Sequence, residues 1–341
     1  ATEAALKAEM QKRFHRAFKT RNSRHFVIVY DTSDAFAAQR GGSLEKAYEG
    51  FMDYFAMNHV RPRFLKKRLV VILFEHREDY LTYARETEHA DMGWAEGYYS
   101  QFTNRTAFYD DASDPDVLAV DGKLDDARTR LKDLGTQIAD ARGHGDLALA
   151  NQLSVERNRL ADTLGRVDNR VGNVVGMLNT MKTAHEAAHQ LSFNTGIQKR
   201  FVDYPLWFSE GLACCFEFED RSALRGPTVI NPGRLIVLKE AIAKHKLVPI
   251  DEFIRAPRPK TTDDEQLSIL YAEGWGLFHY LYRTDRSGLE KFLQIYDGKK
   301  PEVEIPMDEQ VRIFHECFGD DVDALNTRFV AYLKTLPVRM P

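Results

Sequence analysis

Two histidines and a glutamate near the middle of the chain have the spacing of a metal-dependent catalytic site. His185, Glu186 and His189 belong to the pattern HEAAH. Residues four apart on an α-helix share one face, so both imidazoles can reach one metal ion, while Glu186 points beside that ion toward a bound water. Imidazole and carboxylate groups suit zinc, whose catalytic sites usually have three protein ligands and an open fourth position. The motif therefore predicts a zinc site that needs a third ligand.

Glu210 is the candidate for this third ligand. No histidine follows His189 at the Gly-x-x-His spacing of metzincins, whereas Glu210 lies 21 residues past His189 in the apolar segment WFSEGLA. Burying a carboxylate among apolar neighbours is unfavourable without a partner, and a metal ion would be such a partner. Two alternatives stay open: HEAAH could be an exposed polar helix face, and Glu210 could pair with an arginine such as Arg200 or Arg221.

These residues resemble the gluzincin zinc peptidases. The HExxH pattern followed by Glu210 in an EGLA segment looks closest to an uncharacterised bacterial, peptidase-MA-like branch of that class. The resemblance covers residues 24–336 and implies one Zn2+ per chain, held by His185, His189 and Glu210. It also implies that Glu186 is the general base in hydrolysis of a peptide bond. The substrate itself is not predicted.

Further roles follow from that resemblance. Tyr271, 61 residues beyond Glu210 in LYAEGW, is the candidate donor to the developing oxyanion, although the position also suits a core aromatic residue; His279 is a weaker alternative donor. Cys214 stands where some relatives carry an aspartate that orients a histidine ligand, so that orientation stays unassigned. The segment 97–110 lacks the Gly-x-Met-Glu-Asn signature of the aminopeptidases, which favours an endopeptidase or a specialised processing enzyme.

The helices and strands that must position these residues are predicted to form an α+β protein. The resemblance implies a small mixed sheet whose edge strand lines the zinc cleft, then the HExxH helix and a helical C-terminal lobe. Apolar runs at 25–31 and 68–75 predict strands, and aromatic segments in 97–110 predict a hairpin whose strand at 104–110 could align an extended substrate. Helices are predicted at 1–22, 42–58 and 77–86 and, after residue 205, at 206–218, 233–245, 264–282, 288–296, 307–318 and 322–336.

A different composition marks residues 119–180, which predict an inserted coiled-coil hairpin. Apolar residues recur in alternating steps of three and four on both sides of a Gly-His-Gly break, and the second stripe continues in phase to His185. One helix is therefore predicted from 147 to 193, ended by Gly196. The hairpin could dock a protein partner, restrict access to the site, or be a passive insertion. The predicted domains are 1–118 (sheet lobe), 119–180 (hairpin), 181–220 (zinc-binding helices) and 221–341 (helical lobe).

Composition limits the partners. With 47 basic and 51 acidic residues among 341, the net charge of -4 gives no electrostatic reason to expect nucleic acid, and no apolar run approaches the roughly 20 residues that span a bilayer. The three cysteines have neither disulfide-framework nor CxxC spacing. The start at Ala1 is consistent with an exported bacterial protein but does not fix the compartment. Two other functions stay open: an inactive metal- or peptide-binding protein of the same fold, and a coiled-coil interaction protein.

Overall fold

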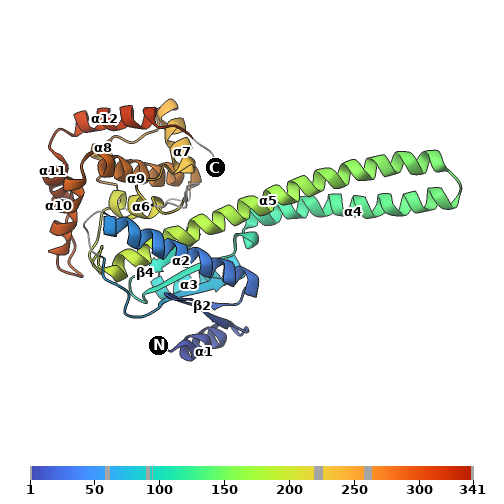
Figure 1. Cartoon of the computed structure of the whole chain (residues 1–341), viewed down its shortest axis with the longest axis horizontal. Helices are drawn as coiled ribbons and strands as arrows, with labels where there is room; N and C mark the ends of the chain where they lie inside the picture. The colour runs from blue at the N-terminus through green and yellow to red at the C-terminus, as the bar shows by residue number, and fades with distance from the viewer. Residues whose placement is uncertain are drawn as a thin grey trace. The chain divides into compact units, whose positions relative to one another are not determined.

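The chain is an α+β protein that is mainly helical and contains one five-stranded mixed sheet (Figure 1). The computed structural model describes residues 2–57, 62–89, 93, 95–218, 226–256 and 263–338. Unit 1 comprises Ala1–Phe74, Glu78–Phe108 and Thr180–Pro341, and unit 2 comprises Glu75–Arg77 and Tyr109–Asn179. Within the described ranges, no helix combines the length and the apolar character needed to cross a membrane.

The sheet has the strand order β1-β2-β3-β5-β4. Its strands are β1 (Lys19–Asn22), β2 (Phe26–Tyr30), β3 (Leu69–Phe74), β4 (Gly97–Ser100) and β5 (Arg105–Tyr109). The pair β2 and β3 is parallel, whereas β1 with β2 and β4 with β5 are antiparallel. All five residues of β2 and five of the six in β3 are buried, as expected for apolar strands covered on both faces.

The strand order corrects one prediction about the cleft. β5 lies between β3 and β4, so both of its edges are already paired, and a strand at 104–110 cannot align a substrate by main-chain pairing. The sequence predicted the β4–β5 hairpin but not which strand is outermost, because strand order is a tertiary property. Among the described strands, β1 and β4 are the outermost, and each is paired along one edge only.

The predicted helix at 1–22 is wrong beyond residue 14. Helix α1 (Glu3–Phe14) ends at His15, whose φ of 52° is left-handed and cannot continue a helix. The chain then forms β1, in which Lys19 lies opposite Tyr30 of β2. The backbone of β2 offers an open row of hydrogen-bonding groups, and pairing with it outweighs the helix propensity of the polar segment.

The remaining predicted helices of unit 1 are present, but α2 begins at Asp34 instead of residue 42 and α6 ends at Cys214 instead of residue 218. Pro205 precedes α6, and Asn231 caps α7 by accepting a hydrogen bond from the Arg234 amide at 3.2 Å. A short helix, α8, was not predicted. The helices are α2 (Asp34–Met57), α3 (Arg77–Glu88), α6 (Leu206–Cys214), α7 (Pro232–Ala243), α8 (Ile250–Phe253), α9 (Asp264–Thr284), α10 (Arg286–Asp297), α11 (Met307–Phe318) and α12 (Val322–Thr335).

Helices α6 and α9 approach each other at their backbones (Figure 1). A Cβ atom built on Gly211 of α6 would lie 2.3 Å from the carbonyl oxygen of Gly274 on α9, closer than real Cβ contacts. The missing side chains therefore allow this approach. Aromatic rings surround the contact on the α6 side, where Trp207 and Phe208 are almost fully buried. This packing fixes the helix that carries Glu210 against the helix that carries Tyr271.

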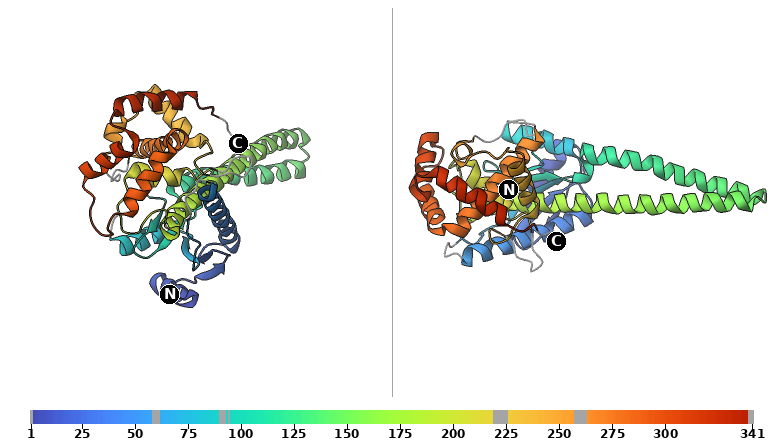
Figure 2. Two further views of the ribbon diagram at one scale, coloured as in Figure 1. Left: turned by 60° about the vertical axis from the view of Figure 1, so that its left-hand side comes forward. Right: turned by 90° about the horizontal axis from the view of Figure 1, so that it is seen from above.

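Unit 2 contains a helical hairpin, α4 (Pro115–Gly143) and the first part of α5 (Leu147–Thr195). The two helices lie side by side (Figure 2) and are joined across the hairpin by Arg128–Asp168 and Arg130–Glu156 pairs at 3.0 and 2.9 Å. Helix α5 is continuous for 49 residues and carries the HEAAH segment near its end. Gly196 follows it with a φ of 81°. The predicted long helix and its glycine stop are therefore confirmed.

Candidate metal centre

The HEAAH segment lies buried in unit 1 near the end of α5. His185 and Glu186 are each 8% exposed, which contradicts the alternative of an exposed polar helix face. The alanines between and beside them, Ala184, Ala187 and Ala188, are almost fully buried, and their small side chains let neighbouring elements approach this helix closely. The segment therefore presents its polar groups inside the protein, where each needs a partner.

Glu210 of α6 meets both histidines. The distances are 3.2 Å from Glu210 Oε2 to His185 Nε2, 3.2 Å from Glu210 Oε2 to His189 Nε2, and 3.2 Å between the two Nε2 atoms. A tetrahedral zinc ion with ligands at about 2.0 to 2.1 Å would hold adjacent ligand atoms about 3.3 Å apart. The three donor atoms thus form a nearly equilateral triangle of the size that one zinc ion requires.

The charges in this cluster favour an ionised Glu210. Burial opposes ionisation, but the charges of His189 and His185 and their hydrogen bonds outweigh it and hold the pKa of Glu210 well below its usual range. The arginine alternative is wrong for Arg200, because that side chain donates to the main-chain oxygen of Gln101. Arg221 lies outside the described residues. Glu210 is therefore an anionic oxygen donor beside two imidazoles.

Glu186 lies next to the edge strand. Burial raises the pKa of Glu186, although His185 and His189 oppose the rise, and a raised pKa suits a group that must accept and return a proton. A Cβ built on Gly97 of β4 would lie 3.2 Å from Cγ of Glu186. Further along, Tyr99 of β4 stacks on Phe193 of α5 with ring centroids 5.6 Å apart. The strand β4 therefore runs beside the second half of α5, beginning at the proposed base.

Glu217, which the sequence analysis missed, orients His185. Its Oε1 is 2.9 Å from His185 Nδ1. Because an ionised carboxylate only accepts hydrogen bonds, Nδ1 carries the proton, which leaves the Nε2 lone pair for a metal. Cys214 Sγ is 3.9 Å from the same nitrogen. A usable signal existed: Glu217 follows Glu210 by seven residues in an apolar run, CCFEF, where a carboxylate again needs a partner.

The start of α7 holds Glu217 in place. Arg234 donates to Glu217 through Nε at 2.9 Å and Nη2 at 2.6 Å, and Asn231 Nδ2 donates at 2.9 Å. This bidentate pair, together with His185, keeps the pKa of Glu217 far below its usual range despite the opposing effect of burial. Arg234 also lies over the ring of Tyr271, with Cζ 5.5 Å from the centroid.

A second group of potential ligands overlaps the first. Within the described residues, His185, Cys214 and Glu217 also have donor atoms within 4.8 Å of one another. Both oxygens of Glu217 already face the Arg234 guanidinium, so a cation occupies that position. Burial raises the pKa of Cys214 to about 11, which keeps it a neutral thiol near pH 7. The set His185, His189 and Glu210 is therefore the better metal site.

The two predicted oxyanion donors differ in position. The ring of half-buried Tyr271 lies 5.9 Å from that of His185, so α9 brings this side chain to the cluster. His279 is two turns further along α9, where Nδ1 is 2.7 Å from the carbonyl oxygen of Pro227 and the ring stacks on Trp275. Burial lowers the pKa of His279 to about 4, so it is neutral. Tyr271 is the candidate that the fold places beside the predicted metal ligands.

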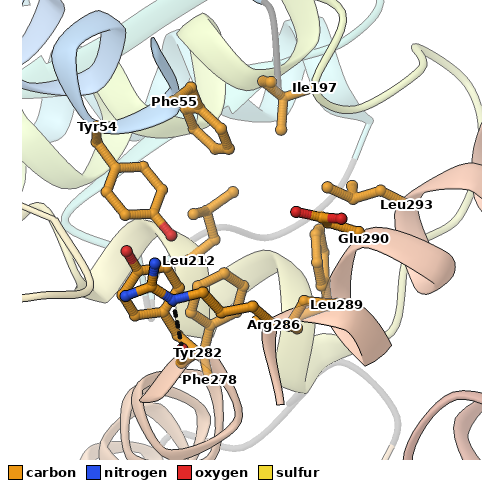
Figure 3. Close-up of a pocket in the computed structure, with 11 residues that line it drawn as sticks. Tyr54, Phe55, Ile197, Leu212, Phe278, Tyr282, Arg286, Leu289, Glu290 and Leu293 are labelled. Atoms are coloured by element: carbon orange, nitrogen blue, oxygen red, sulfur yellow. Dashed lines mark hydrogen bonds between the residues drawn. The ribbon is translucent and has the colours of Figure 1, made fainter. Parts of the chain in front are cut away.

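A pocket on the other side of α6 is separate from this cluster. Leu212 of α6 lines it (Figure 3), as does Phe208 one turn earlier on the same helix face. Glu210 is two residues from each and therefore lies on a different face of α6. Its other walls are mainly apolar, with Tyr54, Tyr282 and Arg286 at one end. None of the predicted site residues lines it, and it offers no metal-binding set.

One known family matches the part of the chain that contains the His185, His189 and Glu210 cluster. The model of a family described as "Protein of unknown function (DUF1570)" matches residues 179–303. This segment contains both histidines, all three glutamates of the cluster, Arg234 and Tyr271, but none of the sheet. The chain matches no curated protein.

Proposed function

We propose that this protein is a zinc-dependent metallopeptidase of the gluzincin type. The observation that carries the proposal is the triangle of His185, His189 and Glu210 donor atoms with 3.2 Å sides, with Glu186 beside it. A site that only bound metal or peptide would have no use for a buried, proton-accepting carboxylate at that position. When bound, zinc would polarise the scissile carbonyl and make a water molecule easier to deprotonate.

The chain's own residues would perform the remaining steps. Glu186 accepts a proton from the attacking water and delivers it to the leaving amine, which its raised pKa favours. Glu217 holds the His185 ring with Nε2 directed at the cluster. Tyr271 donates its hydroxyl proton in a hydrogen bond to the developing oxyanion, a contribution of about 3 kcal/mol for donors of this kind.

The outer edge of β4 provides a place for the substrate. No described strand pairs with that edge, and Gly97 at its start lies against Glu186. An extended peptide that added to this edge would place its main chain beside the proposed base. The segment 97–110 lacks the Gly-x-Met-Glu-Asn signature with which aminopeptidases bind a free amino terminus. Cleavage within a chain is therefore favoured over removal of a terminal residue.

The test combines metal content with cleavage. We expect the full chain to bind one zinc by elemental analysis and to cut an unfolded protein substrate at internal bonds, detected by mass spectrometry. Glu186→Gln should keep the zinc and lose turnover, because a base does not hold the ion, whereas His189→Ala should lose both. Tyr271→Phe should slow turnover with zinc retained. His245→Ala, at an exposed histidine, is the matched control.

Each outcome addresses a different part of the proposal. A protein that binds no zinc after reconstitution contradicts the metal assignment. A zinc-loaded protein that cuts no peptide bond contradicts the peptidase and favours a binding protein of the same fold. Undiminished cleavage by Glu186→Gln would show that another group is the base.

A further inference from the structure

One exposed aromatic ring, next to two half-buried side chains, lies just past the end of β4. Phe102, in the turn between β4 and β5, is 76% exposed. Its ring centroid lies 5.8 Å from that of Phe201, and the Arg200 guanidinium lies over the Phe201 ring at 5.0 Å. We call Phe102, Phe201 and Arg200 the Phe102 platform. All three belong to unit 1.

Hydrogen bonds hold Arg200 and Phe201, the supporting part of the platform, in place. Arg200 donates to the carbonyl oxygen of Gln101, and the amide of Phe201 donates to the Gln101 side chain at 2.7 Å. Phe201 has a φ of 63°, a left-handed conformation that costs a residue with a side chain about 1 to 2 kcal/mol. The carbonyl oxygen of Phe201 accepts from the amide of Glu302 at 2.7 Å, which fixes this strained residue from the other side. Phe201 is half-buried, so this fixed backbone supports the exposed Phe102 ring beside it; strained conformations that the surroundings maintain occur often at functional sites.

The platform follows the end of β4 that is farther from Gly97. β4 begins at Gly97 beside Glu186 and ends at Ser100, two residues before Phe102. A peptide paired with β4 advances by about 3.3 Å per residue, so the platform is reached roughly four residues from the bond beside Glu186. Rigid aromatic rings at such positions supply much of the affinity in peptide recognition.

We propose that the Phe102 platform is a subsite for an aromatic side chain of an extended peptide substrate, roughly four residues from the bond that is cut. This proposal rests on the proposed peptidase function. The exposed face of Phe102 would stack with the substrate ring, while Phe201, itself covered by Arg200, supports Phe102. The platform would then select substrates by a residue remote from the cleaved bond and would require peptides long enough to reach it.

The experiment uses a set of peptides that share one cleavable core. Each carries a single phenylalanine from two to six residues away from the cut bond, on either side, and a truncated core serves as the short peptide. The proteins are the zinc-loaded wild type, Phe102→Ala, Phe102→Tyr and the control Phe64→Ala, which removes another exposed phenylalanine (79% exposed) of unit 1. Cleavage gives kcat and KM, and fluorescence anisotropy on the Glu186→Gln background gives peptide affinity without turnover.

We expect Phe102→Ala to weaken binding and raise KM about tenfold for peptides with phenylalanine roughly four residues from the cut bond on one side. The kcat, the short peptide and the thermal unfolding temperature should not change, and Phe102→Tyr and Phe64→Ala should behave like wild type. The subsite alone is overturned if Phe102→Ala matches wild type for every peptide. It is also overturned if Phe102→Ala loses the same affinity for all of the peptides. A wild type that cuts no peptide overturns the peptidase and the subsite with it.

Discussion

Replacing Glu217 with glutamine would test whether a carboxylate outside the ligand set controls metal binding. Glu217 accepts hydrogen bonds from His185, Asn231 and two nitrogens of Arg234. Glutamine has the same shape but one accepting oxygen, and its amide nitrogen would face other donors. It also removes the negative charge, so Arg234 keeps a positive charge with no buried partner at that position.

The size of both effects follows from these contacts. Breaking a buried ion pair by removing one partner typically destabilises a protein by about 3 to 5 kcal/mol. The Arg234 side chain is 19% exposed, so water partly solvates its unpaired charge. We therefore expect the unfolding free energy of the metal-free protein to fall by about 3 kcal/mol. Loss of a carboxylate that orients a histidine ligand typically weakens metal affinity by about 10 to 100-fold.

Two measurements and a second variant separate these effects. Denaturant unfolding of the metal-free protein gives the stability change, and competition with a chromophoric chelator gives the zinc affinity. Adding Arg234→Met to Glu217→Gln removes the orphaned charge, so most of the stability should return while zinc affinity stays below that of wild type. Wild-type zinc affinity in Glu217→Gln would refute the orienting role. Recovery of both properties in the double variant would show that Glu217 acts through stability alone.

Three further substitutions address the edge strand, a buried carboxyl group and the hairpin. Gly97→Ala places a Cβ 3.2 Å from Cγ of Glu186, so kcat for peptide cleavage should fall while zinc content by elemental analysis is unchanged. Glu273 is 1% exposed, and burial raises its pKa from 4.5 to about 8. Between pH 4.5 and about 8 the folded state therefore keeps a proton on Glu273 that the unfolded state has released. Unfolding free energy should therefore fall as the pH rises from about 5 to 8; Glu273→Gln should remove the part of that fall due to Glu273, whereas Glu265→Gln, at an exposed position on the same helix, should leave it in place. Gly172→Ala, in the interior of α5 with no atom within 4 Å of the new Cβ, should stabilise the helix by about 1 kcal/mol, measured by denaturant unfolding; a loss of stability would show that the glycine has a packing role.

The sequence predicted the features that depend on local patterns. The apolar runs of β2 and β3 and the alternating stripe of α5 reveal their structures because each side chain's face follows from its position along one element. HEAAH is equally local, since its two histidines share a helix. Glu210 lies on another helix, so its contact with these histidines was predicted from two grounds: the cost of burying an unpaired carboxylate, and the resemblance to gluzincins.

What the sequence left out depends on contacts between distant segments. Glu217 and Arg234 are 17 residues apart and meet because α7 begins beside the end of α6, which no periodicity shows. The wrong helix at 15–22 and the wrong edge strand have the same origin: each was decided by which neighbour a segment pairs with. Local sequence describes the preference of a segment, whereas the sheet order and the pairing partners are decided by the whole fold.

The contact between Gly211 and Gly274 bears on how this protein can change over evolution. A side-chain contact between helices can adapt to a substitution by rotating about its χ angles, but a backbone contact has no such freedom. The spacing between the helix of Glu210 and the helix of Tyr271 is therefore set largely by the backbone contact between Gly211 and Gly274. Surrounding core residues can exchange in size and shape while that spacing stays constant. In related chains we expect these two positions to vary less than the larger aromatic residues packed around them.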